Sequence, residues 1–279
     1  MIDEIIELAL KEDIGEGDHT SLSCVPDDAI GKAKLLIKDE GVLAGVQLAK
    51  RIFKRFDPEM EMEVFILDGT SVKPGDIAFE VKGKSRSILA TERLVLNFMQ
   101  RMSGVATQTR QVVDLISHTD AYLLDTRKTT PGIRALEKWA VTIGGGYNHR
   151  FGLYDMIMIK DNHIDYAGGI TKAIERTNNY IKDKGLKINI EIEVRNEAEL
   201  NEVLQNPQVD RIMLDNFDPE LIKKVLPKIP EKIETEASGG ITLENIKAYA
   251  ETGVNFISSG ALTHSVQSLD MSLKAVYTK

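Results

Sequence analysis

Residues 188–206 read INIEIEVRNEAELNEVLQN and show how the second half of the chain is built. In the first seven residues, isoleucine or valine alternates with polar residues, which is typical of a β-strand. Residues 196–206 have the apolar spacing of a helix. The same order of strand and helix recurs after residue 120. Strands that alternate with helices run parallel, so the sequence predicts an α/β fold.

The repeated pattern defines six predicted strands and the helices that follow most of them. The strands are expected at 122–125, 156–159, 188–194, 211–214, 233–237 and 255–258. The helices are expected at 168–184, 196–206, 217–226 and 242–252. This order suits a closed or nearly closed α/β barrel, or an open doubly wound sheet.

The first hundred residues have a different rhythm and predict a small α+β unit. Helices are expected at 1–12, 46–56 and 90–116, the last broken near Ser103-Gly104, and strands at 33–45, 60–67 and 76–82. We therefore expect an N-terminal domain over 1–110 and a barrel domain over 111–279. The segment from about 265 to 279 is expected to pack back on the N-terminal domain.

Composition excludes several classes of protein. Hydrophobic residues make up 42% of the 279 residues, which is ordinary for a globular protein and excludes wholesale disorder. The net charge of −8 argues against a general nucleic-acid binder. The acidic N-terminus does not resemble a signal peptide, and no apolar run is long enough to cross a membrane. We expect a cytoplasmic protein that binds neither nucleic acid nor membrane.

Polar residues and glycines follow the predicted strands at the point where each strand ends. These residues are Asp125, Lys160, Glu193, Asp215, Ser238-Gly239-Gly240 and Ser259-Gly260. In α/β folds, ligands bind at the carboxyl edge of the sheet. Six strand ends of this kind predict a binding site there.

Positive charge is concentrated in residues 127–160. This window holds six Lys or Arg residues against two acids, in a chain that is acidic overall. Because Arg127, Lys128, Arg150 and Lys160 lie near predicted strand ends, they suit a small, multiply anionic ligand. A solvated basic face is the alternative, and Arg134 and Lys138 could be exposed helix charges.

Two further groups of residues suggest a phosphate-containing ligand. Glu193 and Asp215 could share a magnesium ion, which prefers oxygen ligands; alternatively, they pair with Lys160 or Arg127. Glu191 is interpreted as structural. The glycine-rich loops at 238–240 and 259–260 occupy the last two strand ends, where barrels often bind phosphate.

Ten motifs in order along the chain carry a family resemblance. They are EDIGEGDHT (12–20), ERLVLN (92–97), SGVAT (103–107), DTRKT (125–129), GGGYNHR (144–150), IKDNH (159–163), EIEV (191–194), LDN (214–216), EASGGI (236–241) and LTHS (262–265). Through them the chain resembles the quinolinate phosphoribosyltransferases, the decarboxylating nicotinate-nucleotide pyrophosphorylases of NAD biosynthesis. Trp139 departs from the usual tyrosine.

The resemblance implies a fold, a reaction and an assembly. The expected fold is an N-terminal α+β open-faced sandwich followed by an incomplete, seven-stranded α/β barrel. The expected reaction converts quinolinate and phosphoribosyl pyrophosphate, with Mg2+, into nicotinate mononucleotide, pyrophosphate and carbon dioxide. The expected assembly is a homodimer with shared active sites, in which each barrel mouth is covered by the neighbour's N-terminal domain.

The resemblance also implies roles for individual residues. Substrate binding falls to Thr126, Arg127, Lys128, His149, Arg150 and Lys160, together with Arg93 from the partner subunit. The residues expected to be catalytic are Lys128, Lys160, Glu193 and Asp215. Glu193 and Asp215 would hold the metal, directly or through water. Ser238, Gly239, Gly240, Ser259 and Gly260 would bind the 5′-phosphate.

Three other interpretations stay open at this point. A paralogue of the same fold, such as the molybdenum-operon relatives, could act on another substrate. Lys160 could be the nucleophile of a Schiff-base lyase. Residues 68–76 could form a carrier hairpin that bears Lys73, although such a hairpin would not explain the barrel.

Overall fold

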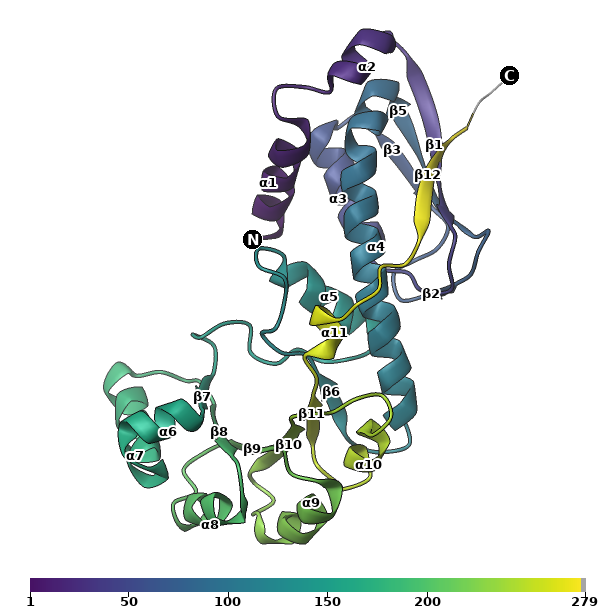
Figure 1. Cartoon of the computed structure of the whole chain (residues 1–279). Helices are drawn as coiled ribbons and strands as arrows, with labels where there is room; N and C mark the ends of the chain where they lie inside the picture. Colours follow the sequence, from purple (N-terminus) through teal and green to yellow (C-terminus); the bar gives the residue numbers. More distant parts are fainter. Residues whose placement is uncertain (277–279) are drawn as a thin grey trace. The chain divides into compact units, whose positions relative to one another are not determined.

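Residues 1–276 are described by a computed structural model, in which the chain forms two compact units (Figure 1). The first unit contains residues 1–111, residues 129–145 and the segment that begins at residue 262. The second contains residues 112–128 and 146–261. The division is thus not a single cut near residue 110, because two later segments group with the N-terminal unit.

A four-stranded antiparallel sheet forms the centre of the first unit. Its order is β12 (Met271–Ala275), β1 (Ile30–Ile37), β5 (Ile77–Lys84) and β3 (Glu61–Val64), and Ala33 is paired with Ala275. Alternate residues of β1 are buried, because one face of the sheet packs on the core. Strands β2 (Gly41–Val42) and β4 (Ser71–Val72) form a separate pair. The last strand of the chain therefore completes the N-terminal sheet.

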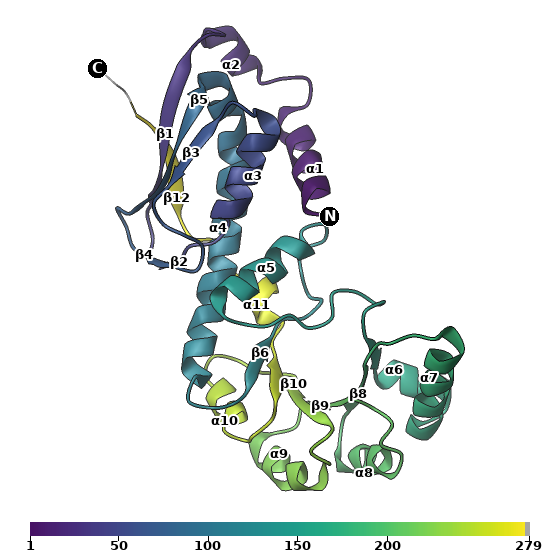
Figure 2. The same ribbon diagram turned by 180° about the vertical axis from the view of Figure 1, so that it is seen from behind.

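The first unit also contains most of the N-terminal helices. They are α1 (Ile2–Ile14), α2 (His19–Cys24), α3 (Val46–Phe56) and α5 (Arg134–Gly144), with α11 (Ala261–His264) near the end of the chain. Figure 2 shows α3 beside β3 and β5. Asp68 fixes the start of α3, because its carboxylate accepts hydrogen bonds from the main-chain N–H groups of Val46 and Gln47.

Helix α4 (Ser85–Ile116) is continuous, so the break predicted near Ser103-Gly104 is wrong. The residues that suggested a break instead allow close packing. Ser103 donates a hydrogen bond to the Ala44 carbonyl, and a methyl group at Gly104 would lie 2.2 Å from the carbonyl oxygen of Gln267. Gly104 therefore brings the chain that leads to β12 close to the helix.

A parallel six-stranded sheet forms the second unit and confirms the predicted fold class. Its order is β6 (Tyr122–Leu124), β11 (Phe256–Ser258), β10 (Glu234–Ser238), β9 (Arg211–Asp215), β8 (Ile190–Val194) and β7 (Ile157–Ile159). Beyond β6, Tyr147 makes an isolated parallel bridge with Leu124. The described sheet thus has six strands, one fewer than the resemblance implies, and its barrel is incomplete.

Helices of the second unit follow its strands. They are α6 (Asp161–Ala167), α7 (Ile170–Lys184), α8 (Glu197–Gln205), α9 (Pro219–Val225) with the short 3-10 turn η1 (Leu226–Lys228), and α10 (Ile246–Ala250). Figure 1 shows α7, α8 and α9 along one side of the sheet. The predicted 242–252 helix is shorter than expected, because Asn245 binds Thr242 N–H and the Gly240 carbonyl in a turn. Within residues 1–276, none of the helices is long and apolar enough to cross a membrane.

Gly104→Ala should destabilise the protein, because the new methyl group would overlap main-chain atoms of Gln267. We expect a loss of about 1–3 kcal/mol, measured as a fall of several degrees in Tm. The control is Gln111→Ala, an exposed position in the same helix, which should change stability by less than about 0.5 kcal/mol. Equal melting temperatures for Gly104→Ala and wild type would contradict the proposed close packing.

Candidate active site

The parallel register brings the polar strand ends of the second unit to one edge of the sheet. Ser238 at the end of β10 is paired with Asp215 at the end of β9, and Glu193 on β8 is paired with Met213. On β8, Glu191 and Glu193 share the face opposite to Ile190 and Ile192. This edge therefore gathers the acids and hydroxyls that the sequence analysis selected.

Arg150 and Arg127 carry positive charges that influence one another. Arg150 is partly buried, and its guanidinium Nη1 donates to the Met156 carbonyl oxygen at 3.2 Å. Burial lowers the pKa of Arg150, and the neighbouring positive charge of Arg127 lowers it further. An anion between the two guanidinium groups would relieve this repulsion.

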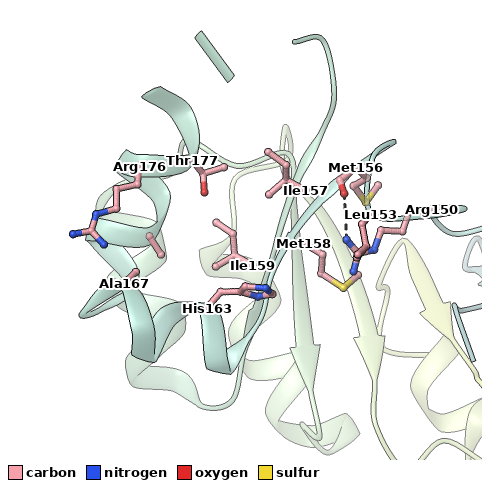
Figure 3. A pocket seen from close by; sticks show the side chains of 11 residues that line it. Arg150, Leu153, Met156, Ile157, Met158, Ile159, His163, Ala167, Arg176 and Thr177 are labelled. Atoms are coloured by element: carbon pink, nitrogen blue, oxygen red, sulfur yellow. Dashed lines mark hydrogen bonds between the residues drawn. The ribbon is translucent and has the colours of Figure 1, made fainter. Parts of the chain in front are cut away.

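A cavity of about 400 Å³ lies beside Arg150, along edge strand β7. Figure 3 shows the Arg150 side chain next to Met158 and Met156, with His163 on the same wall and Arg176 farther away. The walls between these basic groups are formed by isoleucine and methionine side chains. Such a cavity suits a flat organic molecule that carries negative charge.

Lys160, Glu193 and Asp215 form a second group at the sheet edge. Lys160 Nζ donates to Glu193 Oε2 at 2.9 Å, and the main-chain N–H of Lys160 donates to His163 Nδ1. Burial raises the pKa of Asp215, and the nearby charge of Glu193 raises it further. Two carboxylates that repel each other in this way are suited to share a divalent cation.

The His149 imidazole lies below these groups, inside the sheet unit, with its side chain only 4% exposed. Its Nε2 is 3.0 Å from Glu191 Oε2 and 3.4 Å from Glu236 Oε2. Burial alone would lower the pKa of His149, whereas the hydrogen bonds and charges of the two carboxylates raise it. Burial and the charge of Glu236 raise the pKa of Glu191 to about 7.

Hydrogen bonds along the chain fix His149 and its neighbour Arg150. The buried carboxylate of Asp125, just after β6, accepts from His149 N–H at 2.8 Å. The ring Nδ1 accepts from Arg150 N–H at 2.6 Å. Because Nδ1 is occupied as an acceptor, a proton of the ring lies on Nε2, facing Glu191.

Arg211 supplies positive charge to the buried acids. Its Nη1 donates to Glu236 Oε2 at 3.2 Å, while Nε and Nη2 donate to Glu234 Oε2. Its guanidinium also lies 3.9 Å from the centre of the Phe256 ring. Glu234 is 46% exposed at its side chain, whereas Glu191 and Glu236 are completely buried.

The two glycine-containing loops lie at neighbouring strand ends. Ser258 Oγ donates to Ser238 Oγ at 3.1 Å, and Ser259 N–H donates to the Leu124 carbonyl. Gly239 has a φ of 89°, and a methyl group there would lie 2.4 Å from Asn216 Oδ1. Asn216 in turn donates to the Asp215 carboxylate at 2.7 Å. Asn216 therefore joins the acidic group to the 238–240 loop.

Of the remaining basic candidates, three are exposed and one is buried. Arg127 and Lys128 are exposed after β6, where Lys128 N–H donates to Thr126 Oγ1 at 3.0 Å. Arg93 is exposed on α4, in the first unit. The suggestion that Lys138 is an exposed helix charge is wrong, because this residue is only 2% exposed in α5.

Sequence reasoning missed the partners of His149. Glu236 appeared only within a motif, Arg211 was not selected, and Glu191 was interpreted as structural. These residues are far apart in sequence, so no spacing reveals their contacts. A partial signal was present, because β8 alternates glutamate with isoleucine and valine, and β10 places Glu234 and Glu236 at alternate positions.

Family models match both halves of the chain. The model for the quinolinate phosphoribosyl transferase N-terminal domain matches residues 18–103, and that for the C-terminal domain matches residues 105–274. The chain belongs to the quinolinate phosphoribosyltransferase family. This membership accounts for the barrel and both phosphate-type loops, which the carrier-hairpin interpretation of Lys73 does not; Lys73 lies in the turn after β4.

Individual members of the family align over nearly the whole chain. The Nicotiana tabacum protein named quinolinate phosphoribosyltransferase (decarboxylating) 2a, mitochondrial, is 46% identical, over 97% of this chain and 81% of the relative. The Bacillus subtilis protein named probable nicotinate-nucleotide pyrophosphorylase (carboxylating) is 45% identical, over 94% and 89%. The solved nicotinate-nucleotide pyrophosphorylase of Francisella tularensis superposes with a TM-score of 0.91 at 39% identity, covering 99% and 96%.

Proposed function

We propose that this family member transfers the phosphoribosyl group of phosphoribosyl pyrophosphate to quinolinate. Carbon dioxide and pyrophosphate leave, and nicotinate mononucleotide is formed. This proposal rests on the family to which the chain belongs and on Arg150, which lines a cavity with isoleucine and methionine walls. Quinolinate is a flat ring with two adjacent carboxylates, which complements such a site.

Cationic side chains would hold the two substrate carboxylates. Arg127 and Arg150 offer planar guanidinium groups for paired hydrogen bonds. Lys128 and Lys160 add compact charges, and Thr126 lies in the same loop as Arg127. Charge-assisted hydrogen bonds of this kind are worth about 1.5–3 kcal/mol each. They explain how an acidic protein concentrates an anion.

Glu193 and Asp215 fit a magnesium site by their chemistry. Each offers carboxylate oxygens, and their mutual repulsion raises the pKa of Asp215. When bound, magnesium would neutralise negative charge on the departing pyrophosphate. The same carboxylates would stabilise positive charge on the ribose as its bond to pyrophosphate weakens. Ser238, Gly239, Gly240, Ser259 and Gly260 would bind the 5′-phosphate through hydroxyl and main-chain N–H groups.

The bond-forming step requires both substrates to be held in the correct relative position. The pyridine nitrogen of quinolinate attacks the anomeric carbon as pyrophosphate leaves, and the ring becomes positively charged. The electron pair released when the adjacent carboxylate departs as carbon dioxide is then stabilised by this ring. Lys128 and Lys160 are the candidates to deliver the proton that replaces the carboxylate.

A homodimer with shared sites would complete the pocket. In this arrangement, Arg93 of each subunit reaches the substrate carboxylates bound by the neighbouring barrel. The exposure of Arg93 on α4 is compatible with such a contact. The cytoplasmic location expected from the sequence stays a prediction.

A direct assay tests the proposed activity. The purified protein is incubated with quinolinate, phosphoribosyl pyrophosphate and magnesium, and nicotinate mononucleotide is measured by chromatography. We expect product that depends on all three components. A folded protein that makes no product would contradict the proposal and favour a paralogue with another substrate, whereas borohydride trapping at Lys160 would favour a Schiff-base lyase.

Arg150→Glu should abolish quinolinate binding, because it replaces a carboxylate-binding group with a repelling one. We expect a Kd at least about 100-fold higher by calorimetry, equivalent to about 3 kcal/mol. The control is Lys184→Glu at the exposed end of α7, which should leave the quinolinate Kd unchanged. Similar affinities for Arg150→Glu and wild type would rule out this assignment.

Asp215→Asn should reduce turnover far more than quinolinate affinity, because its proposed role is to hold magnesium and stabilise developing charge. We expect kcat to fall about 100-fold or more, with less than a threefold change in quinolinate Kd. Glu220→Gln on the exposed surface of α9 is the control. Normal turnover of Asp215→Asn at low magnesium would show that this carboxylate is structural.

Mixing two inactive variants tests the shared site. Arg93→Ala and Lys160→Ala homodimers should each be nearly inactive. After random subunit exchange, half of the dimers are mixed and each mixed dimer has one intact site, so activity should recover to about a quarter of wild type. Exchange is followed with mass-tagged subunits. Demonstrated exchange without recovery would mean that Arg93 acts within its own subunit.

A further inference from the structure

The strongest unassigned feature is the buried cluster of His149, Glu191, Glu236 and Arg211. Both glutamates are fully buried, and Arg211 is 10% exposed at its side chain. Their oxygens and His149 Nε2 lie within 4.8 Å of one another. Burying a carboxylate costs free energy unless its charge is compensated, so packing alone does not explain this arrangement.

The cluster is better suited to hold an imidazole than a metal ion. Arg211 already places a positive charge 3.2 Å from Glu236 Oε2, which weakens the attraction of this carboxylate for a cation. Glu191 Oε2 faces His149 Nε2 directly at 3.0 Å. A proton on Nε2 would lie beside Glu191 Oε2, whereas Glu191 Oε1 and Glu236 Oε1 are buried without a hydrogen-bond partner among the described residues.

The orientation of this ring reaches Arg150 through the main chain. With Nε2 directed at the glutamates, Nδ1 points back to accept the Arg150 N–H at 2.6 Å. Asp125 holds the other side of the peptide by accepting the His149 N–H. Rotation of the imidazole would break the hydrogen bond between Nδ1 and the Arg150 N–H. The main chain of Arg150 would then lose this restraint.

We propose that Glu191 and Glu236 are positioning residues for quinolinate binding, which act through His149 to fix the backbone of Arg150. This inference rests on the proposed quinolinate site. Arg211 compensates one of the two acidic charges and keeps Glu236 in place. Because their contacts reach the site only through His149 and Arg150, we expect them to affect quinolinate binding.

Matched substitutions at the two partners of Arg211 test this proposal. Glu236→Gln removes a charge that faces His149, and Arg211 keeps its two hydrogen bonds to Glu234. Glu191→Gln removes the other contact. Each should raise the quinolinate KM about 10-fold and change the phosphoribosyl pyrophosphate KM less than twofold. Glu234→Gln also loses a partner of Arg211 but has no contact with His149, so it should leave both KM values within twofold of wild type.

A double-mutant cycle then tests the route through His149. His149→Gln alone should raise the quinolinate KM selectively, and adding Glu191→Gln should change that KM less than twofold. Circular dichroism and Tm establish whether each variant folds. If Glu191→Gln and Glu236→Gln do not fold, His149→Gln still tests the route, because it retains Glu191, Glu236 and Arg211.

Several results would overturn the inference. They are equal increases in both KM values, a Glu234→Gln effect as large as that of Glu236→Gln, additive effects in the cycle, or a normal quinolinate KM for His149→Gln. Stoichiometric transition metal in the wild type that is lost in Glu191→Gln would assign the cluster to metal binding instead. Absence of product from wild type would refute the proposed activity, a result distinct from all of these.

Discussion

The parallel register of the six-stranded sheet is the constraint on which the site depends. Because Ser238 is paired with Asp215 and Glu193 with Met213, consecutive strands end at one edge, and the side chains that follow them converge. Parallel sheets are usually buried on both faces and apolar throughout. Here one face is apolar against helices, while the other carries acids and hydroxyls at alternate positions. One face of the sheet therefore packs in the core, and the other carries the candidate site residues.

Where the barrel is incomplete, an irregular segment after Tyr147 carries two of the candidate site residues. Tyr147 makes only one bridge to β6, and the chain after it is free to adopt an irregular path. A regular strand would direct alternate side chains to opposite faces. The chain after Tyr147 likewise places His149 in the interior and Arg150, the next residue, at the cavity, without a strand ladder on both sides. His149 and Arg150, although consecutive, therefore lie in different surroundings.

Local sequence patterns predicted much of the fold. Helix 46–56 was predicted with the bounds that the structure has, because its apolar and charged residues separate cleanly around a helix. Most strand positions were also within a few residues of those observed, but the predicted strand 33–45 is divided into β1 and β2. Strand β12 was not identified as a strand, because its existence depends on pairing with β1. Similarly, Gly104 resembles a helix breaker until its close approach to Gln267 is known.

The site was predicted unevenly for the same reason. Strand-end residues such as Lys160 and Asp215 are visible from local pattern, since a strand end can be located from sequence. The contact of His149 with Glu236 joins distant segments and depends on the irregular loop after Tyr147. The burial of Lys138 likewise reflects how α5 packs, which its own sequence does not reveal.

The pairing of β1 with β12 has a consequence for how the protein is made. A ribosome releases β1 long before β12, so the N-terminal sheet lacks an edge strand while the residues between them are made. The exposed edge of β1, with Leu35 and Ile37 in its sequence, is then available to other chains. Synthesis of this protein therefore includes a long interval in which chaperones have a defined segment to protect.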